Sequence, residues 1–177
     1  MMYYRYIDYI MRSVGATAES LIDVGSGNCP YLDWFDWIPE RVSVDIRVPY
    51  RSEGVKGIQG DIFELTFDKT FDICTCFQVL EHVPEAERFA RRLQELGKLV
   101  IVSVPYKWGD KPRVTPGHVQ DPVTYDKLTG WMGRAANYKI IVEEPFGQNK
   151  CKRLIALYDA NHDRRFGPGT GKNRILR

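Results

Sequence analysis

The sequence has few of the features that mark specialised protein classes. Its 25 Lys and Arg residues nearly balance 23 Asp and Glu residues, so a net charge of +2 creates no overall field that favours nucleic acid or a membrane surface. No window approaches the roughly 18 apolar residues that a membrane span needs. The aromatic, charged N-terminus does not resemble a signal peptide. We therefore expect a cytoplasmic protein with no membrane partner.

Cysteine and histidine are also scarce, with four and three residues respectively. The cysteines form no CxxC pair and show no spacing with the histidines that is typical of a metal site. Cys74 and Cys76 lie two residues apart in a strand-like run, so both are expected to face the same side as packed thiols. Free, buried cysteines fit a reducing compartment, and the spacing predicts no bound metal.

The remaining composition indicates one domain followed by a tail. With 177 residues, 44% of them hydrophobic, the chain is long enough to bury a substantial core. We expect this domain to span residues 1–160. Residues 161–177 are rich in glycine and basic side chains, which predicts a flexible basic tail.

Alternating patterns along residues 1–160 predict an α/β fold with about seven strands. A short apolar strand, 20–24, runs into a turn with two glycines, Gly25 and Gly27, and Pro30 is suited to open a short helix after it. Strands are expected at 20–24, 41–46, 57–59, 71–77, 98–104, 138–142 and 153–158, and helices at 3–14, 30–37, 84–96 and 121–132. Asp121 is the expected cap of the last helix, with Pro122 at its first position.

Polar residues follow the predicted strands at their carboxyl ends, where open α/β sheets bind ligands. Asp45 ends the second strand, and a carboxylate there can accept two hydrogen bonds from the adjacent hydroxyls of a ribose. Asp61 follows the third strand and could accept from an exocyclic amine, with Ile62 beside it as an apolar face for a base. Each residue alone could be a strand-end or turn residue. Together, in this order, they favour nucleotide binding.

The chain resembles the class I S-adenosylmethionine-dependent methyltransferases over about residues 18–160. The matching stretches are Asp23-Val24-Gly25-Ser26-Gly27, Asp45, Gly60-Asp61-Ile62, and Phe71-Asp72-Ile73 with Val79-Leu80-Glu81-His82-Val83 after it. The run Leu80-Glu81-His82-Val83 is similar to that of the subset acting mostly on small molecules. Cys29 stands where a third glycine of the first motif often occurs.

This resemblance implies a Rossmann-like, mostly parallel sheet in the order 3-2-1-4-5-7-6, flanked by helices and with its last strand antiparallel. It also implies S-adenosyl-L-methionine as the cofactor. The residues it assigns to the cofactor are Asp23, Gly25, Ser26, Gly27, Asp45, Ile46, Asp61, Ile62, Phe77, Gln78 and His82. Glu81 is given a structural role. The short N-terminal region leaves room for a lid from a partner subunit, so a homodimer is one arrangement that the sequence allows.

His118 is the predicted catalytic residue, because it lies in the long loop after the fifth strand and a hydroxyl or amine acceptor must lose a proton. The alternative is a loop histidine that is hydrogen-bonded to the backbone. The expected partner is a small-molecule methyl acceptor at an O or N atom, rather than nucleic acid. An RNA methyltransferase using the basic tail, a non-catalytic S-adenosylmethionine-binding protein and a nicotinamide-dependent oxidoreductase are the competing interpretations.

Overall fold

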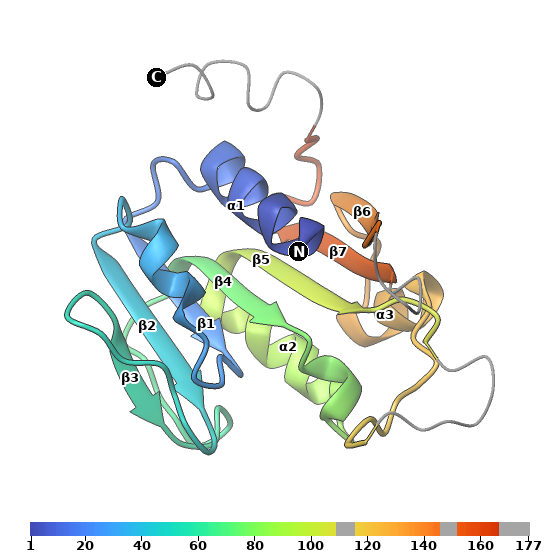
Figure 1. The fold of residues 1–177 in the computed structure, drawn as a ribbon, viewed down its shortest axis with the longest axis horizontal. Helices are drawn as coiled ribbons and strands as arrows, with labels where there is room; N and C mark the ends of the chain where they lie inside the picture. Colours follow the sequence, from blue (N-terminus) through green and yellow to red (C-terminus); the bar gives the residue numbers. More distant parts are fainter. Residues whose placement is uncertain (109–115, 146–151, 167–177) are drawn as a thin grey trace.

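Seven strands form one sheet in the computed structural model, which describes residues 1–108, 116–145 and 152–166 (Figure 1). The strand order is β3-β2-β1-β4-β5-β7-β6. The strands are β1 (Ser20–Val24), β2 (Glu40–Asp45), β3 (Lys56–Gln59), β4 (Phe71–Phe77), β5 (Gly97–Pro105), β6 (Tyr138–Glu143) and β7 (Lys152–Asp159). Strands β1 to β5 pair in parallel, whereas β7 is antiparallel to both β5 and β6. The predicted sheet order and the antiparallel last strand are confirmed.

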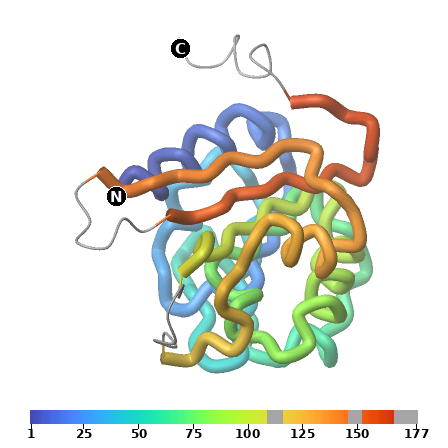
Figure 2. The backbone as a smooth tube through the Cα atoms, turned by 90° about the vertical axis from the view of Figure 1, so that its right-hand side faces the viewer, coloured from blue at the N-terminus to red at the C-terminus, as the bar shows by residue number. Residues whose placement is uncertain are grey.

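Both faces of the sheet are covered, because successive strand residues point to opposite sides. In β1, Leu21 packs with α1 (Met2–Val14) and the 3₁₀ helix η1 (Pro30–Phe35), while Ile22 packs in the cluster that contains α2 (Ala86–Leu96) and α3 (Tyr125–Met132). Figure 2 shows the antiparallel β6 and β7 ribbon, in orange and red, closing one edge of this sandwich.

The amphipathic helices follow the predicted periodicity. The buried face of α2 consists of Ala86, Phe89, Ala90, Leu93 and Leu96. No helix among residues 1–108, 116–145 and 152–166 is long and apolar enough to cross a membrane.

Two details differ from the sequence expectations. The segment after the glycine turn forms the 3₁₀ helix η1 rather than an α-helix, and it buries Tyr31, Leu32 and Phe35. The last helix begins at Tyr125, and its cap is Thr124, whose hydroxyl accepts a hydrogen bond from the Lys127 N–H at 3.2 Å. The predicted cap, Asp121, is instead engaged with a histidine, as described below.

The cysteines Cys74 and Cys76 are both fully buried in β4, as their spacing predicted. Burial raises the pKa of both thiols, which keeps them protonated and unreactive.

The start of the predicted tail contacts the domain. The Asn137 side chain donates hydrogen bonds to the backbone carbonyls of Asn161, His162 and Arg164 at 3.0–3.3 Å. Residues 167–177 lie outside the described residues, so the boundary at residue 160 stays a prediction.

Candidate active site

The parallel register brings the predicted site residues to one edge of the sheet. Val24 is paired with Val44, and Asp45 with Gln59, so the glycine turn, Asp45 and the Gly60–Asp61 turn all follow at the same carboxyl edge. Strand β4 ends there too, at Phe77. In open α/β sheets this edge is where ligands bind.

The turn after β1 needs glycine for two different reasons. Gly25 has φ +80°, and a Cβ at this position would lie only 2.5 Å from Cγ2 of Val79, so a side chain would be both strained and blocked. Gly27 has φ +51°, but a Cβ there would meet no atom within 4 Å. The second glycine therefore faces open space, as expected where backbone must approach a ligand.

Asp45 joins the ends of β1 and β2 through its carboxylate. Oδ2 accepts a hydrogen bond from the Gly27 N–H at 2.9 Å, and Oδ1 accepts from the N–H groups of Arg47 and Val48 at 2.8 and 3.1 Å. These donors hold the carboxylate at the rim of the glycine turn, and each oxygen retains acceptor capacity for a ribose hydroxyl. Ser26 links the turn to β2, because its buried hydroxyl is hydrogen-bonded to the Ser43 hydroxyl at 2.6 Å.

Asp61 holds a tight turn after β3. Its Oδ1 accepts the Phe63 N–H at 2.9 Å, and its carbonyl accepts from Glu64 and Leu65. The two predicted apolar neighbours differ: Ile62 is 4% exposed and packs in the core, whereas Ile46 is 64% exposed at the end of β2. Ile46 is therefore the side chain accessible to a ligand on this side.

Asp23 is a fully buried carboxylate in the middle of the sheet. Its Oδ1 accepts a hydrogen bond from the Thr75 hydroxyl at 2.6 Å, while Oδ2 has no partner among the described residues. Burial raises the pKa of this carboxyl to about 6, and the hydroxyls of Thr75 and Tyr31 offset part of that effect. A buried acceptor without a donor is costly, so a donor from a bound ligand would stabilise it.

The end of β4 carries Phe77 and Gln78 into the same region. Gln78 adopts φ +58°, its N–H donates to the Ser103 carbonyl at 2.9 Å, and its side-chain amide donates to the Ser103 hydroxyl at 3.1 Å. That hydroxyl also contacts the Tyr3 hydroxyl at 2.6 Å. Phe77 packs against Tyr31, so α1, η1, β4 and β5 are all tied together at this edge.

His118 is buried and oriented by a carboxylate. It is 8% exposed, and its Nδ1 lies 2.6 Å from Oδ2 of Asp121. Because an ionised carboxylate only accepts hydrogen bonds, Nδ1 carries the proton and the lone pair of neutral His118 is on Nε2. The Trp108 ring lies parallel to the imidazole, with 6.1 Å between the centroids.

His82 and Glu81 complete a cluster around His118. The His82 ring meets His118 edge to face at a centroid distance of 4.6 Å, and its Nδ1 donates to the Gly117 carbonyl at 2.8 Å. Glu81 is 1% exposed, and burial raises the pKa of its carboxyl to about 8. Its Oε2 has no hydrogen-bond partner among the described residues.

The sequence predicted only a structural role for Glu81, and the structure places its carboxyl beside His82 and His118. The available signal was a carboxylate directly beside a histidine at a strand end. The 37-residue separation between Glu81 and His118 concealed their proximity.

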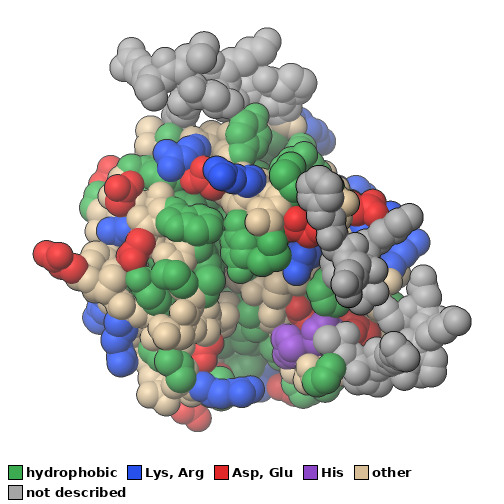
Figure 3. All heavy atoms as spheres, in the orientation of Figure 1, with side chains coloured by type: hydrophobic (Ala, Val, Ile, Leu, Met, Phe, Trp, Pro, Cys, Tyr) green, Lys and Arg blue, Asp and Glu red, His purple; other side chains and the backbone are tan. Residues whose placement is uncertain are grey.

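Figure 3 shows where the histidine side chains (purple) reach this surface: they lie at the rim of a recess whose floor is hydrophobic (green). The glycine turn is close to the cluster, because Val79, which packs against Gly25, precedes Glu81 by two residues. The predicted cofactor residues and the predicted catalytic residue are therefore neighbours along the sheet edge.

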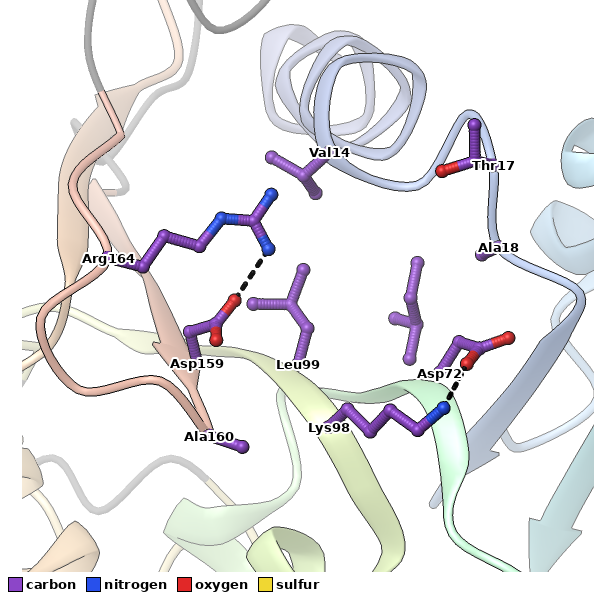
Figure 4. A pocket seen from close by; sticks show the side chains of 10 residues that line it. Val14, Thr17, Ala18, Asp72, Lys98, Leu99, Asp159, Ala160 and Arg164 are labelled. Atoms are coloured by element: carbon purple, nitrogen blue, oxygen red, sulfur yellow. Dashed lines mark hydrogen bonds and ion pairs between the residues drawn. The ribbon is translucent and has the colours of Figure 1, made fainter.

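A cavity of about 430 Å³ lies at the opposite, amino end of the strands (Figure 4). Its charged side chains form two ion pairs, Lys98 with Asp72 at 2.8 Å and Arg164 with Asp159 at 2.7 Å. No residue predicted to bind the cofactor or to act in catalysis lines it. We therefore assign the chemistry to the carboxyl edge rather than to this cavity.

The carboxyl edge fits an adenosyl cofactor. It offers an open glycine turn at Gly27, a carboxylate with spare acceptor capacity at Asp45, and an unpartnered buried acceptor at Asp23. A Rossmann-like sheet in this order with such a site defines the class I S-adenosylmethionine-dependent methyltransferases.

Comparison with known proteins agrees with this class. Residues 22–99 match the family model described as a methyltransferase domain. Residues 22–99 thus belong to an S-adenosylmethionine-dependent methyltransferase domain, and the chain has the class I fold, as the resemblance implied. No curated protein sequence matches the chain significantly.

Three solved structures share the fold. A Burkholderia thailandensis 1,6-didemethyltoxoflavin-N1-methyltransferase aligns with a TM-score of 0.69 and 19% identity, over 86% of this chain and 76% of that chain. The YcgJ protein of Bacillus subtilis aligns at 0.62 and 14%, over 86% and 97%. The [4+2]-cyclase SpnF aligns at 0.67 and 15%, over 86% and 78%. At these identities the likeness concerns the fold alone, and the cyclase illustrates that one fold serves different reactions.

Proposed function

We propose that the protein transfers the methyl group to an oxygen or nitrogen atom of a small-molecule acceptor. The observation that carries this proposal is the His118–Asp121 pair at 2.6 Å, beside the recess at the carboxyl edge. An imidazole with its lone pair fixed on Nε2 is suited to take a proton from a hydroxyl or amine. The Burkholderia thailandensis neighbour, which was solved with bound 1,6-didemethyltoxoflavin and S-adenosylhomocysteine, acts on a compound of this size class.

The proposed cofactor contacts follow the geometry. Asp45 accepts from the ribose hydroxyls, Asp61 and Ile46 border the base, and Asp23 orients the turn or the amino group of the donor. The remaining proposed cofactor residues are Gly25, Ser26, Gly27, Ile62, Phe77, Gln78 and His82. Because Ile62 is buried, its contribution would come from its backbone.

In catalysis the protein mainly positions groups and moves one proton. Bound S-adenosylmethionine supplies a methyl group already activated by its sulfonium. Nε2 of His118 accepts the proton that the acceptor atom loses when it gains the methyl group. Asp121 keeps the imidazole oriented and stabilises its charged form. We propose residues 1–160 as the catalytic domain and 161–177 as a basic tail without a catalytic role.

The proposal is tested by a methylation screen with labelled donor across metabolite and RNA extracts, preceded by calorimetric titration with S-adenosylhomocysteine and NAD. We expect binding of S-adenosylhomocysteine, no binding of NAD, and label in a small-molecule fraction. Binding of NAD alone would indicate an oxidoreductase and contradict the assignment.

Two other results would replace the acceptor proposal. Label in RNA, lost when ionic strength is raised, would indicate an RNA methyltransferase that uses its basic tail. Cofactor binding without label in any fraction would indicate a non-catalytic S-adenosylmethionine-binding protein.

A further inference from the structure

The cluster formed by Glu81, His82 and His118 has more polar atoms than hydrogen-bond partners. One ligand atom from each residue lies within 4.8 Å of the other two. Oε2 of Glu81 and Oδ1 of Asp121 are buried, and neither has a hydrogen-bond donor among the described residues. Two buried carboxylate oxygens without partners are costly unless a cation or a bound group compensates them.

His82 and His118 are in the same tautomer, with the proton on Nδ1 and the lone pair on Nε2. Nδ1 of His82 donates to the Gly117 carbonyl, and Nδ1 of His118 donates to the Asp121 carboxylate, so both lone pairs are on Nε2. No described residue forms a hydrogen bond with either Nε2 atom. Metal-binding histidines are typically oriented in this way, with the second nitrogen donating to a carbonyl or carboxylate.

We propose that Glu81, His82 and His118 bind a divalent first-row transition-metal ion, with Asp121 as the residue that orients His118. Two imidazole nitrogens and one carboxylate oxygen form a three-ligand set that leaves coordination positions open. Imidazole ligands favour zinc, iron, cobalt or nickel over magnesium, which prefers oxygen ligands. The spacing of the sequence gave no sign of this site, and the fold assembles it.

The three side chains would have to move closer together to hold such an ion. Ligand atoms at about 2.1 Å from one ion are roughly 3 to 3.4 Å apart, so the present separations of up to 4.8 Å call for side-chain rotation. Gly117 packs against the His82 ring. It has φ +84°, and a Cβ at this position would lie 3.3 Å from Nδ1 of His82. His82 is exposed, which gives an ion access from solvent.

The local charge also favours a cation. Two carboxyl groups lie near each other, with Glu81 buried and the Asp121 side chain 10% exposed. Arg153 is the cation that acts on Glu81 among the described residues, but it lies over the Trp108 ring and is 3.9 Å from Glu144. A divalent ion between the imidazoles and Glu81 would give the ionised Glu81 carboxyl the partner that it lacks among the described residues.

The role of the ion rests on the proposed function, whereas its binding does not. At its open positions the ion would hold an acceptor oxygen or nitrogen and favour its deprotonated form. With the ion bound, His118 would be a ligand and the proton of the acceptor would pass to solvent, whereas in the metal-free chain His118 takes that proton. Methyl transfer would consequently be faster with added metal and slower after chelation.

The test uses the full chain after removal of metal with a chelator, without cofactor or acceptor. We expect Co²⁺ and Zn²⁺ to bind at one equivalent by calorimetry, with a Co²⁺ visible absorption band, and Mg²⁺ to bind at least 100-fold more weakly. Glu81→Gln and His82→Gln should weaken Co²⁺ binding more than 10-fold, and Asp121→Asn by about 10- to 100-fold. The control His162→Gln, at the third histidine, should leave the affinity unchanged.

A second measurement needs no variant. In the Co²⁺-loaded wild-type chain, the ring resonances of His82 and His118 should be shifted strongly in proton NMR, and those of His162 should not. Absence of saturable binding, binding that persists in Glu81→Gln and His82→Gln, tighter binding of Mg²⁺, or shifts confined to His162 would each overturn the metal site.

Calorimetry with S-adenosylhomocysteine separates this inference from the proposed function. A Glu81→Gln variant that loses the metal but keeps its affinity for S-adenosylhomocysteine supports the site. If the wild-type chain binds metal but no S-adenosylhomocysteine, the proposed function fails and the metal site stands.

Discussion

The two ends of the central strands differ in how completely their charges are paired. At the amino end, Asp72 accepts from Lys98 and from the N–H groups of Glu19 and Ser20, and Asp159 is paired with Arg164. At the carboxyl end, carboxylate oxygens of Asp23, Glu81 and Asp121 are buried without a hydrogen-bond partner among the described residues. The unpartnered buried nitrogens at the amino end, Nε of Arg41 and of Arg134, belong to guanidinium groups that donate hydrogen bonds through another nitrogen.

The amino end nevertheless contains the cavity of about 430 Å³. Volume therefore does not identify the functional end of this protein. Buried acceptors without donors identify it better. Such acceptors destabilise the fold, and they are kept where a ligand, an ion or a proton supplies the missing partner.

The largest effect is expected for His118→Asn. Loss of a positioned proton acceptor should lower kcat by about 10²- to 10⁴-fold, because Asn cannot take up the proton. Affinity for S-adenosylhomocysteine should change less than threefold. Steady-state kinetics and calorimetry measure both quantities, with His162→Asn as the matched control. A fall in kcat of less than tenfold would remove His118 from the mechanism.

Asp23 should make stability depend on pH. Its carboxyl has a pKa of about 6 in the folded protein, compared with the ordinary value of 3.8 for a solvated aspartate, so the folded state binds the extra proton between about pH 4 and 6. This contribution to stability is therefore present at low pH and is lost as the pH rises through that window, by up to about 3 kcal/mol.

Asp23→Asn removes this titration. In urea unfolding without cofactor, the free energy of unfolding of the variant relative to wild type should rise from pH 4 to pH 7. A difference between the two proteins that does not change with pH would show that Asp23 is not a strained carboxyl.

Asp45→Ala should weaken cofactor binding by about 10- to 100-fold, because a charged acceptor of hydrogen bonds contributes about 1.5–3 kcal/mol. Titration with S-adenosylhomocysteine measures the dissociation constant. Asp45→Asn is the matched variant that keeps the size and one carbonyl acceptor, and it should lose less affinity. An unchanged constant in the alanine variant would count against the ribose role.

The smallest effect is expected at the amino end. Lys98→Ala breaks the pair with Asp72, in which the Lys98 side chain is 64% exposed, so the free energy of unfolding should fall by less than about 1 kcal/mol. Cofactor affinity should not change. A change in affinity comparable to that of Asp45→Ala would mean that the two ends are not functionally distinct.

Local patterns were sufficient to predict the strands, and the resemblance to the methyltransferases implied their order. Strands, turns and helices each have residue patterns that can be recognised within a few neighbouring positions. Such patterns mark the glycine turn after β1, the carboxylates Asp45 and Asp61, and the run that ends at Val83. The seven-stranded order is confirmed in full. Helix ends were less predictable: Asp121 has the chemistry of a cap, but its contact with His118 takes precedence, and Thr124 caps the helix.

The side-chain cluster could not be predicted, because it depends on distances that only the folded chain sets. Glu81 and His118 are 37 residues apart, and the contact forms because the carbonyl of Glu81 accepts the N–H groups of Val119 and Gln120. Likewise, nothing in the sequence distinguishes the buried Ile62 from the exposed Ile46.

The most direct test of the central claim is backbone amide NMR of the wild-type chain titrated with S-adenosylhomocysteine. If the carboxyl edge is the cofactor site, the largest shift changes will fall on the residues that follow β1, β2, β3 and β4, at Gly25 to Gly27, Ile46, Asp61 and Gln78. The amides of Asp72, Lys98 and Arg164 will stay unchanged. Shift changes concentrated on those last three residues would place the ligand in the amino-end cavity and contradict the account.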